Sequence, residues 1–162
     1  MKAFKMAQRV FFLLLACGIF CIGCGGQIYN DGRSQGSVIT PRSAWRAGGD
    51  LRSPPFAIDG DVNTAASSIA SDGRGSLTID LGKPCVFNMI IIDHGQNEFG
   101  YARRVAVLTS MDGQSFTQRY AAAGTRRATI LCPATPIIAR FVRLQAMVAG
   151  SQPWSVAEVY IQ

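Results

Sequence analysis

Short runs of alternating apolar and polar residues fill the chain from Ser76 to its C-terminus, separated by Gly, Pro, Asn and Asp. Alternation with a period of two residues is typical of strands with one buried face, and the separating residues are typical of turns. No long segment shows a helical period. The pattern predicts an all-β sandwich with strands over residues 76–82, 86–93, 104–110, 116–120, 128–132, 140–146 and 156–161.

The first two predicted strands differ in pattern. The strand over 76–82 alternates regularly and is expected to stop at the turn signal Gly82-Lys83-Pro84. The run over 86–93 is instead continuously apolar and rich in β-branched residues, which predicts a central strand buried on both faces.

Residues 1–23 have the pattern of an export signal. Three basic residues precede the apolar run Val10–Ile22, which is shorter than the ~20 residues that a membrane-spanning helix needs. The sequence around Cys24 resembles a bacterial lipobox, which makes Cys24 the predicted lipidated first residue of the mature protein. Two alternatives remain open, namely lipidation at Cys17 and secretion without a lipid.

Residues 24–36 are polar and Gly-rich, which predicts a tether ahead of one domain over 37–162. The protein is expected to be an exported lipoprotein of the bacterial cell envelope, held at the membrane through its N-terminal lipid only. The net charge of +6 falls to about +3 after cleavage, because losing three of the 16 basic residues leaves 13 against 10 acidic ones. The basic residues form no long run, which argues against a nucleic-acid partner.

Several sequence motifs follow one another in a fixed order along the predicted domain. They are Ala57–Thr64 with Leu77–Pro84, Ser110–Phe116, Ala139–Leu144 and Gln152–Val159. Together they resemble the coagulation factor 5/8 type C (discoidin) domain, a group that includes the carbohydrate-binding modules of family 32. The resemblance implies a discoidin-like jelly-roll β-sandwich, of the galactose-binding-domain-like type.

The polar turn Ala57–Thr64 is dense in oxygen-bearing side chains, a composition that suits a hard cation. In the family, a structural Ca²⁺ commonly lies where this turn meets the C-terminal strand. An alternative is an ion pair between Glu158 and an arginine, with Asp59 capping its own turn, since a carboxylate among apolar residues needs a partner or a cation. The resemblance assigns the Ca²⁺ to carbonyls of Phe56, Asp61 and Ala157, the carbonyl and hydroxyl of Thr64, and the carboxylates of Asp59 and Glu158.

The loop from Asp93 to Arg104 combines hydrogen-bonding groups with aromatic rings. This mixture suits a sugar, because hydroxyls take planar polar partners and the apolar face of the ring takes an aromatic side chain. In sugar-binding relatives of the family, ligand contacts cluster in loops at one end of the sandwich, this loop included. The alternative is a polar surface loop with an aromatic side chain tucked beneath it. The predicted ligand contacts are His94, Asn97, Phe99, Tyr101 and Arg103.

Two cysteines, Cys85 and Cys132, remain in the predicted domain. Thiols of an exported chain either pair or are buried separately. The sequence leaves both a disulfide and two free thiols open.

The residues of a hydrolase are missing from the sequence. The chain has a single histidine and shows no nucleophile–base pair and no pair of glycosidase-like carboxylates. We therefore expect a non-catalytic binding module, anchored at the envelope and recognising carbohydrate on a cell-surface or extracellular glycan. The alternative is a protein-interaction or adhesion module that docks an envelope protein without binding sugar.

Overall fold

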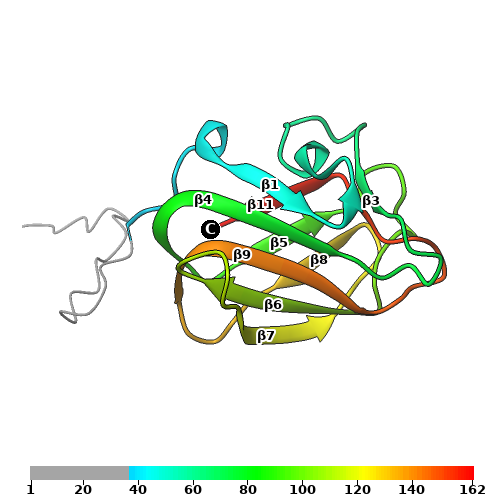
Figure 1. Ribbon diagram of the computed structural model, residues 1–162. Helices are drawn as coiled ribbons and strands as arrows, with labels where there is room; N and C mark the ends of the chain where they lie inside the picture. The colour runs from blue at the N-terminus through cyan, green and yellow to red at the C-terminus, as the bar shows by residue number, and fades with distance from the viewer. Residues whose placement is uncertain (1–36) are drawn as a thin grey trace, which may run out of the picture.

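Five antiparallel strands form the larger layer of a β-sandwich, in the computed structural model that describes residues 37–162 (Figure 1). Two three-stranded sheets pack across the core from this layer. The larger sheet has the order β1 (Arg46–Gly49), β4 (Ser76–Phe87), β9 (Ile137–Val148), β6 (Arg104–Ser110) and β7 (Thr117–Ala123). The smaller sheets are β10 (Ser155–Val156), β3 (Ala66–Ser68) and β2 (Leu51–Arg52), and β11 (Glu158–Ile161), β5 (Ile90–Asp93) and β8 (Ala128–Leu131). The all-β prediction is confirmed.

The core lies between these sheets and follows the alternation of the long strands. Leu77, Ile79 and Leu81 of β4 are fully buried, and so are Val142 and Leu144 of the neighbouring β9. Each buried aliphatic side chain contributes about 1.5–3 kcal/mol through removal of apolar surface from water. Short 3₁₀ helices, η1 (Arg42–Ala44) and η2 (Pro54–Ala57), flank the first strand.

Strand β4 corrects the predicted boundary between the first two strands. It continues through Gly82-Lys83-Pro84 to Phe87, and the irregularity appears as a register shift against β9 between Asp80 and Cys85. Because β4 pairs with β9 both before and after Gly82-Lys83-Pro84, these three residues stay within the sheet. The 86–93 prediction is also wrong in part, because β5 begins only at Ile90 and the side chain of Ile91 is partly exposed.

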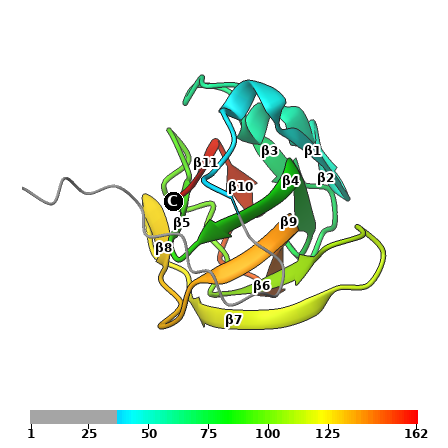
Figure 2. The same ribbon diagram turned by 90° about the vertical axis from the view of Figure 1, so that its left-hand side faces the viewer.

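Both termini of the described chain lie at one end of the sandwich, which we call the terminal end. The amide of Ser37 donates to Pro84 O at 3.0 Å, and the amide of Gln162 donates to Met89 O at 2.9 Å. Figure 2 looks onto this end. Strand β5 begins beside the C-terminus and ends at Asp93, so the segment that follows it lies at the opposite end (Figure 1). We call that opposite end, formed by residues 57–64, 93–103, 124–128 and 148–154, the loop end.

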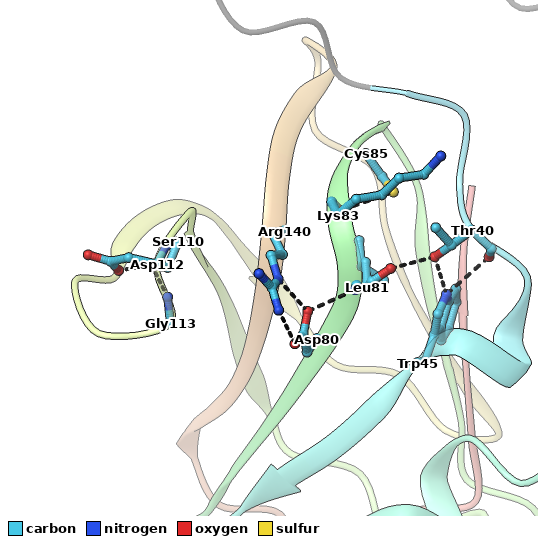
Figure 3. A network of polar contacts seen from close by, with 11 residues as sticks. Thr40, Trp45, Asp80, Leu81, Lys83, Cys85, Ser110, Asp112, Gly113 and Arg140 are labelled. Carbon is cyan, nitrogen blue, oxygen red and sulfur yellow. Dashed lines mark hydrogen bonds and ion pairs between the residues drawn. The ribbon is translucent and has the colours of Figure 1, made fainter.

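Hydrogen-bonded side chains close the terminal end (Figure 3). The indole nitrogen of Trp45 donates to the carbonyl and the hydroxyl of Thr40 at 3.1 and 3.0 Å, and that hydroxyl donates to Leu81 O at 2.6 Å. Beside it, the guanidinium of Arg140 binds both carboxylate oxygens of Asp80 at 2.9 Å. These four side chains therefore have partners within the protein.

The two cysteines of the described chain are not paired. Cys85 is buried and Cys132 is exposed, and both are free thiols. The disulfide alternative is therefore wrong, and the expectation of burial holds only for Cys85. No helix within residues 37–162 has the length and apolar character to cross a bilayer.

Candidate functional site

The loop that the sequence singles out begins where β5 ends. Strand pairing places Asp93 between Ala128 of β8 and Glu158 of β11. The loop is therefore flanked by the β7–β8 turn on one side and by the polar turn 57–64 on the other. Residues far apart in the sequence meet here because β8 and β11 both pair with β5, and the segments next to its last residue therefore lie at the same edge of the sheet.

A shallow, open depression lies between these three segments. Its volume is about 320 Å³, near the lower limit of ligand pockets and sufficient for one sugar ring. A carboxylate, a primary amide and a guanidinium stand at its margin, with aliphatic surface between them. Its lining residues are Val62, Asp93, Gly95, Gln96, Arg127 and Ala128.

Hydrogen bonds hold the margin of the depression in place. The amide of Gly95 donates to Asp93 Oδ1 at 2.8 Å, and Gln96 Nε2 donates to Asn63 Oδ1 at 2.8 Å. Arg127 has a φ of +68°, a conformation that costs energy for a residue with a side chain. It persists because the Arg127 carbonyl accepts from the amide of His94 and its amide donates to Glu98 O. The guanidinium is thereby presented to solvent.

His94 does not lie in this depression, and its predicted role as a ligand contact is wrong. Its side chain is 1% exposed, with Nδ1 2.6 Å from Ser155 O and Nε2 3.1 Å from Thr129 Oγ1. Burial lowers the pKa of His94 below its usual 6.5, against an opposing effect of the Ser155 carbonyl. His94 is thus a neutral structural residue beneath the loop.

The other predicted contacts lie further along the loop, outside the lining of the depression. Asn97 and Arg103 are exposed, and Tyr101 is half-buried. The amide of Arg103 donates to Val148 O at 2.9 Å, which places this part of the loop against the 148–154 segment. Phe99 is exposed, and the Arg126 guanidinium lies over its ring at 4.3 Å from the ring centre.

The comparisons with known proteins agree with this architecture. Residues 37–159 match the F5/8 type C domain family. The chain belongs to the F5/8 type C domain family. No curated protein matches its sequence.

Solved structures similar to this F5/8 type C domain include three modules from Clostridium perfringens. CpGH89CBM32-5, in complex with GalNAc-β-1,3-galactose, has a TM-score of 0.67 at 21% identity, over 75% of this chain and 96% of that one. The family 32 module of NanJ, in complex with galactose, has a TM-score of 0.65 at 20% identity, over 77% and 97%. CBM32-3 of a family 31 glycoside hydrolase has a TM-score of 0.63 at 23% identity, over 75% and 92%. At such identities the likeness establishes the fold.

The residues predicted to hold calcium in this F5/8 type C domain meet around the turn 57–64. Asp59 Oδ1 accepts from the amide of Asp61 at 2.9 Å, and Asp59 Oδ2 accepts from the hydroxyl of Thr64 at 2.8 Å. Glu158 Oε1 accepts from the amide of Gly60 at 2.6 Å, while Oε2 contacts the guanidinium of Arg42. Phe56 precedes the turn in η2, and Ala157 precedes Glu158 between β10 and β11.

This arrangement does not fit a bound Ca²⁺. Both oxygens of Asp59 and Oε1 of Glu158 accept hydrogen bonds from the chain itself, and the guanidinium of Arg42 stands beside Glu158 Oε2. The contacts are instead those of the alternative, an arginine paired with Glu158 and Asp59 capping its own turn. Calcium binding itself stays a prediction.

Sequence reasoning missed the three polar residues of the depression: Asp93 and Gln96 lie in the predicted loop but were not among the predicted contacts, and Arg127 lies outside that loop. The signal for Arg127 is the Arg126-Arg127 pair directly before β8, which has no special meaning unless β8 is known to lie beside β5. Glu98 connects the loop after β5 with this arginine pair, because its carboxylate forms ion pairs with both Arg126 and Arg127. The distance between Glu98 Oε2 and Arg127 Nε is 3.6 Å. The Arg126 guanidinium lowers the pKa of Glu98, so this carboxylate stays ionised at neutral pH.

Proposed function

We propose that this domain binds carbohydrate, without catalysing a reaction, in the depression at the loop end. The observation that carries the proposal is the lining itself: Asp93, Gln96 and Arg127 surround an aliphatic patch in a hollow the size of one sugar ring. Complexes of two modules of the same fold with galactose and with GalNAc-β-1,3-galactose support the ligand class.

The chemistry of the lining suits a neutral sugar. The Asp93 carboxylate accepts hydrogen bonds from hydroxyl groups, the Arg127 guanidinium donates them, and the amide of Gln96 does both. The apolar face of a pyranose covers Val62 and Ala128. A shallow site with so few contacts binds weakly, with a Kd on the order of 0.1–1 mM.

Anchoring at the envelope is the second part of the proposal. Cys24, the predicted lipidation site, lies outside the described residues. The described chain begins at Ser37, at the terminal end, so a lipid attached upstream would tether the domain by the end opposite to the depression. Changing Cys24 to Ala is expected to release the protein from the membrane fraction, and mass spectrometry of the wild type should detect a lipid on its N-terminus. An unmodified N-terminus downstream of Cys24 overturns this part.

A glycan-array screen of the full-length chain in detergent tests the ligand class. We expect binding to glycans with accessible galactose or GalNAc. Arg127→Asn should then lower the affinity at least 10-fold, because a lost charged hydrogen bond costs ~1.5–3 kcal/mol. Asn tolerates a positive φ, so this variant removes the guanidinium without adding strain.

Two further variants make the assignment specific. Gln96→Ala should weaken the same glycan, whereas Arg103→Gln, on the other part of the loop, should leave its affinity unchanged. If Arg103→Gln abolishes binding and Arg127→Asn does not, the site lies beside the 148–154 segment. If no glycan binds, the domain is an interaction module for protein.

A further inference from the structure

Glu158 is a charged residue at a fully buried position. It opens strand β11 between Ala157 and Val159, and its exposed fraction is 0%. One carboxylate oxygen, Oε1, accepts from the amide of Gly60 at 2.6 Å. An amide hydrogen bond does not replace the hydration of a full negative charge, so an ionised carboxylate at this depth requires a positive charge beside it.

The positive charge comes from Arg42, which lies near the start of the described chain, whereas Glu158 lies near its C-terminus. Arg42 begins η1, and its guanidinium contacts Glu158 Oε2. Its Nε and Nη2 atoms are themselves buried and have no hydrogen-bond partner within residues 37–162, so the Glu158 carboxylate is the group that balances their charge. The guanidinium lies 5.1 Å from the ring centre of Tyr160 and 5.8 Å from that of Trp45, distances at which an aromatic face attracts a cation. The two rings thus hold the guanidinium against the carboxylate.

The two carboxylates of the turn 57–64 are engaged in the turn itself. Both oxygens of Asp59 accept bonds from within the turn, from the amide of Asp61 and the hydroxyl of Thr64. The amide of Asn63 and its side chain donate to the carboxylate of Asp61. The carboxylates of this turn therefore have partners without an ion. A divalent cation placed among these oxygens would also stand beside the Arg42 guanidinium, which repels it.

We propose that Arg42 is a built-in cation that balances Glu158 in place of a divalent metal ion, so that this domain folds and stays folded without calcium. The guanidinium joins the start of the domain to its last strand, and the turn 57–64 is fixed against Glu158 through Gly60. Arg42 and a metal ion are mutually exclusive partners of the same carboxylate.

Thermal unfolding of the full-length chain tests this directly. The wild-type Tm should agree within about 1 °C in excess EDTA and in millimolar CaCl₂, and calorimetric titration with CaCl₂ should give no binding heat. A ligand that binds only the folded state would raise the Tm. A rise of several degrees in CaCl₂ overturns the proposal, and this measurement needs no variant that folds.

Substitutions of Arg42 test its role independently of added calcium. Arg42→Gln should lower the Tm by ~10 °C, because it leaves a buried charge without a partner. Arg74→Gln is the matched control, since Arg74 is an exposed arginine paired with Asp72, and it should lower the Tm by less than ~2 °C. Equal effects of the two substitutions overturn the proposal.

A double-mutant cycle assigns the effect to Glu158. In a Glu158→Gln background the charge is gone, so Arg42→Gln should lower the Tm by much less than it does in the wild type. The same loss in both backgrounds would show that Arg42 acts through packing on the rings of Trp45 and Tyr160, and would overturn the assignment of charge balance.

Discussion

The two ends of the sandwich use polar side chains in opposite ways. At the terminal end, Trp45, Thr40, Asp80 and Arg140 are bonded to one another or to the backbone (Figure 3). At the loop end, Arg127 directs an 84% exposed side chain to solvent beside a hollow of about 320 Å³. Both ends close the same core, so the difference lies in how much of the polar side chains stays exposed beyond their partners in the protein, as for Gln96 beside Asn63 and Arg127 beside Glu98.

This difference separates stability from binding. A side chain with its partners inside the protein contributes to the free energy of unfolding and has little left to offer a ligand. An exposed guanidinium or amide contributes little to folding and is available to a sugar hydroxyl. Substitutions at the terminal end should therefore change stability, and substitutions at the margin of the depression should change affinity.

The largest expected effect is that of Trp45→Ala at the terminal end. Trp45 is 4% exposed and its single N–H is shared between two acceptors of Thr40, so the substitution should lower the free energy of unfolding by ~3–5 kcal/mol in urea titrations. Trp45→Phe, which retains an aromatic ring but not the N–H group, should cost less. A loss below ~1 kcal/mol for the alanine variant would show that the terminal end is not closed by this residue.

The second largest loss of stability is expected for His94→Ala. This substitution tests whether the loop end contains both structural and ligand-binding residues. The substitution leaves the Ser155 carbonyl without its buried side-chain partner, at ~1–3 kcal/mol, whereas the Thr129 hydroxyl keeps its bonds to Thr125. The loop should thus lose stability at His94 but not two residues later, where exposed Gln96 affects binding alone. Chemical denaturation of His94→Ala and Gln96→Ala compares them, and equal stability of the two variants would contradict the structural role of His94.

The same histidine should give a pH dependence of smaller size. Burial lowers the pKa of folded His94 below the usual 6.5 of the unfolded chain. On acidification the unfolded state therefore takes up the proton first, so the free energy of unfolding should fall as the pH drops from about 6.5 toward the folded pKa. His94 is the only histidine, so His94→Gln should remove this slope. A slope that persists in the variant would assign it to another group.

The smallest expected effect is that of Asp80→Asn at the terminal end. The Arg140 guanidinium lowers the pKa of Asp80, but the side chains of this pair are 24% and 41% exposed. Solvent weakens such pairs, so the loss should be below about 1 kcal/mol at pH 7. Because the folded pKa is lowered, the contribution should vanish as the pH falls below 3.8 through the folded value. A loss of several kcal/mol would mean that the pair behaves as a buried one.

Strands with clear local alternation could be predicted from the sequence, whereas features that depend on strand pairing could not. Strand β6 has the bounds that its alternation and the following Asp112-Gly113 turn predict, Arg104–Ser110. Strand β4 was not predictable through Gly82, because only its pairing with β9 on both sides of the irregularity keeps it extended. Short strands such as β2 and β3 have too few residues to show a period.

The candidate site was readable in position but not in composition. A polar loop after an apolar strand pointed to Asp93–Arg104, yet the same loop contains buried His94 and exposed Gln96 two residues apart. No local pattern distinguishes them. Arg127 and Val62 reach the depression only through the pairing of β5 and through the approach of the turn 57–64, which are long-range properties.

The most direct test of carbohydrate binding at the loop end is an NMR titration with the glycan that the array selects. The amide chemical shifts are followed as the glycan is added. Full-length protein labelled with ¹⁵N should show dose-dependent shifts at Gly95, Gln96 and Arg127, with a Kd on the order of 0.1–1 mM. Amides of the terminal end, such as Gly113, should stay unchanged. No shift at saturating sugar, or shifts centred on the terminal end, would contradict the assignment of the ligand site to the depression.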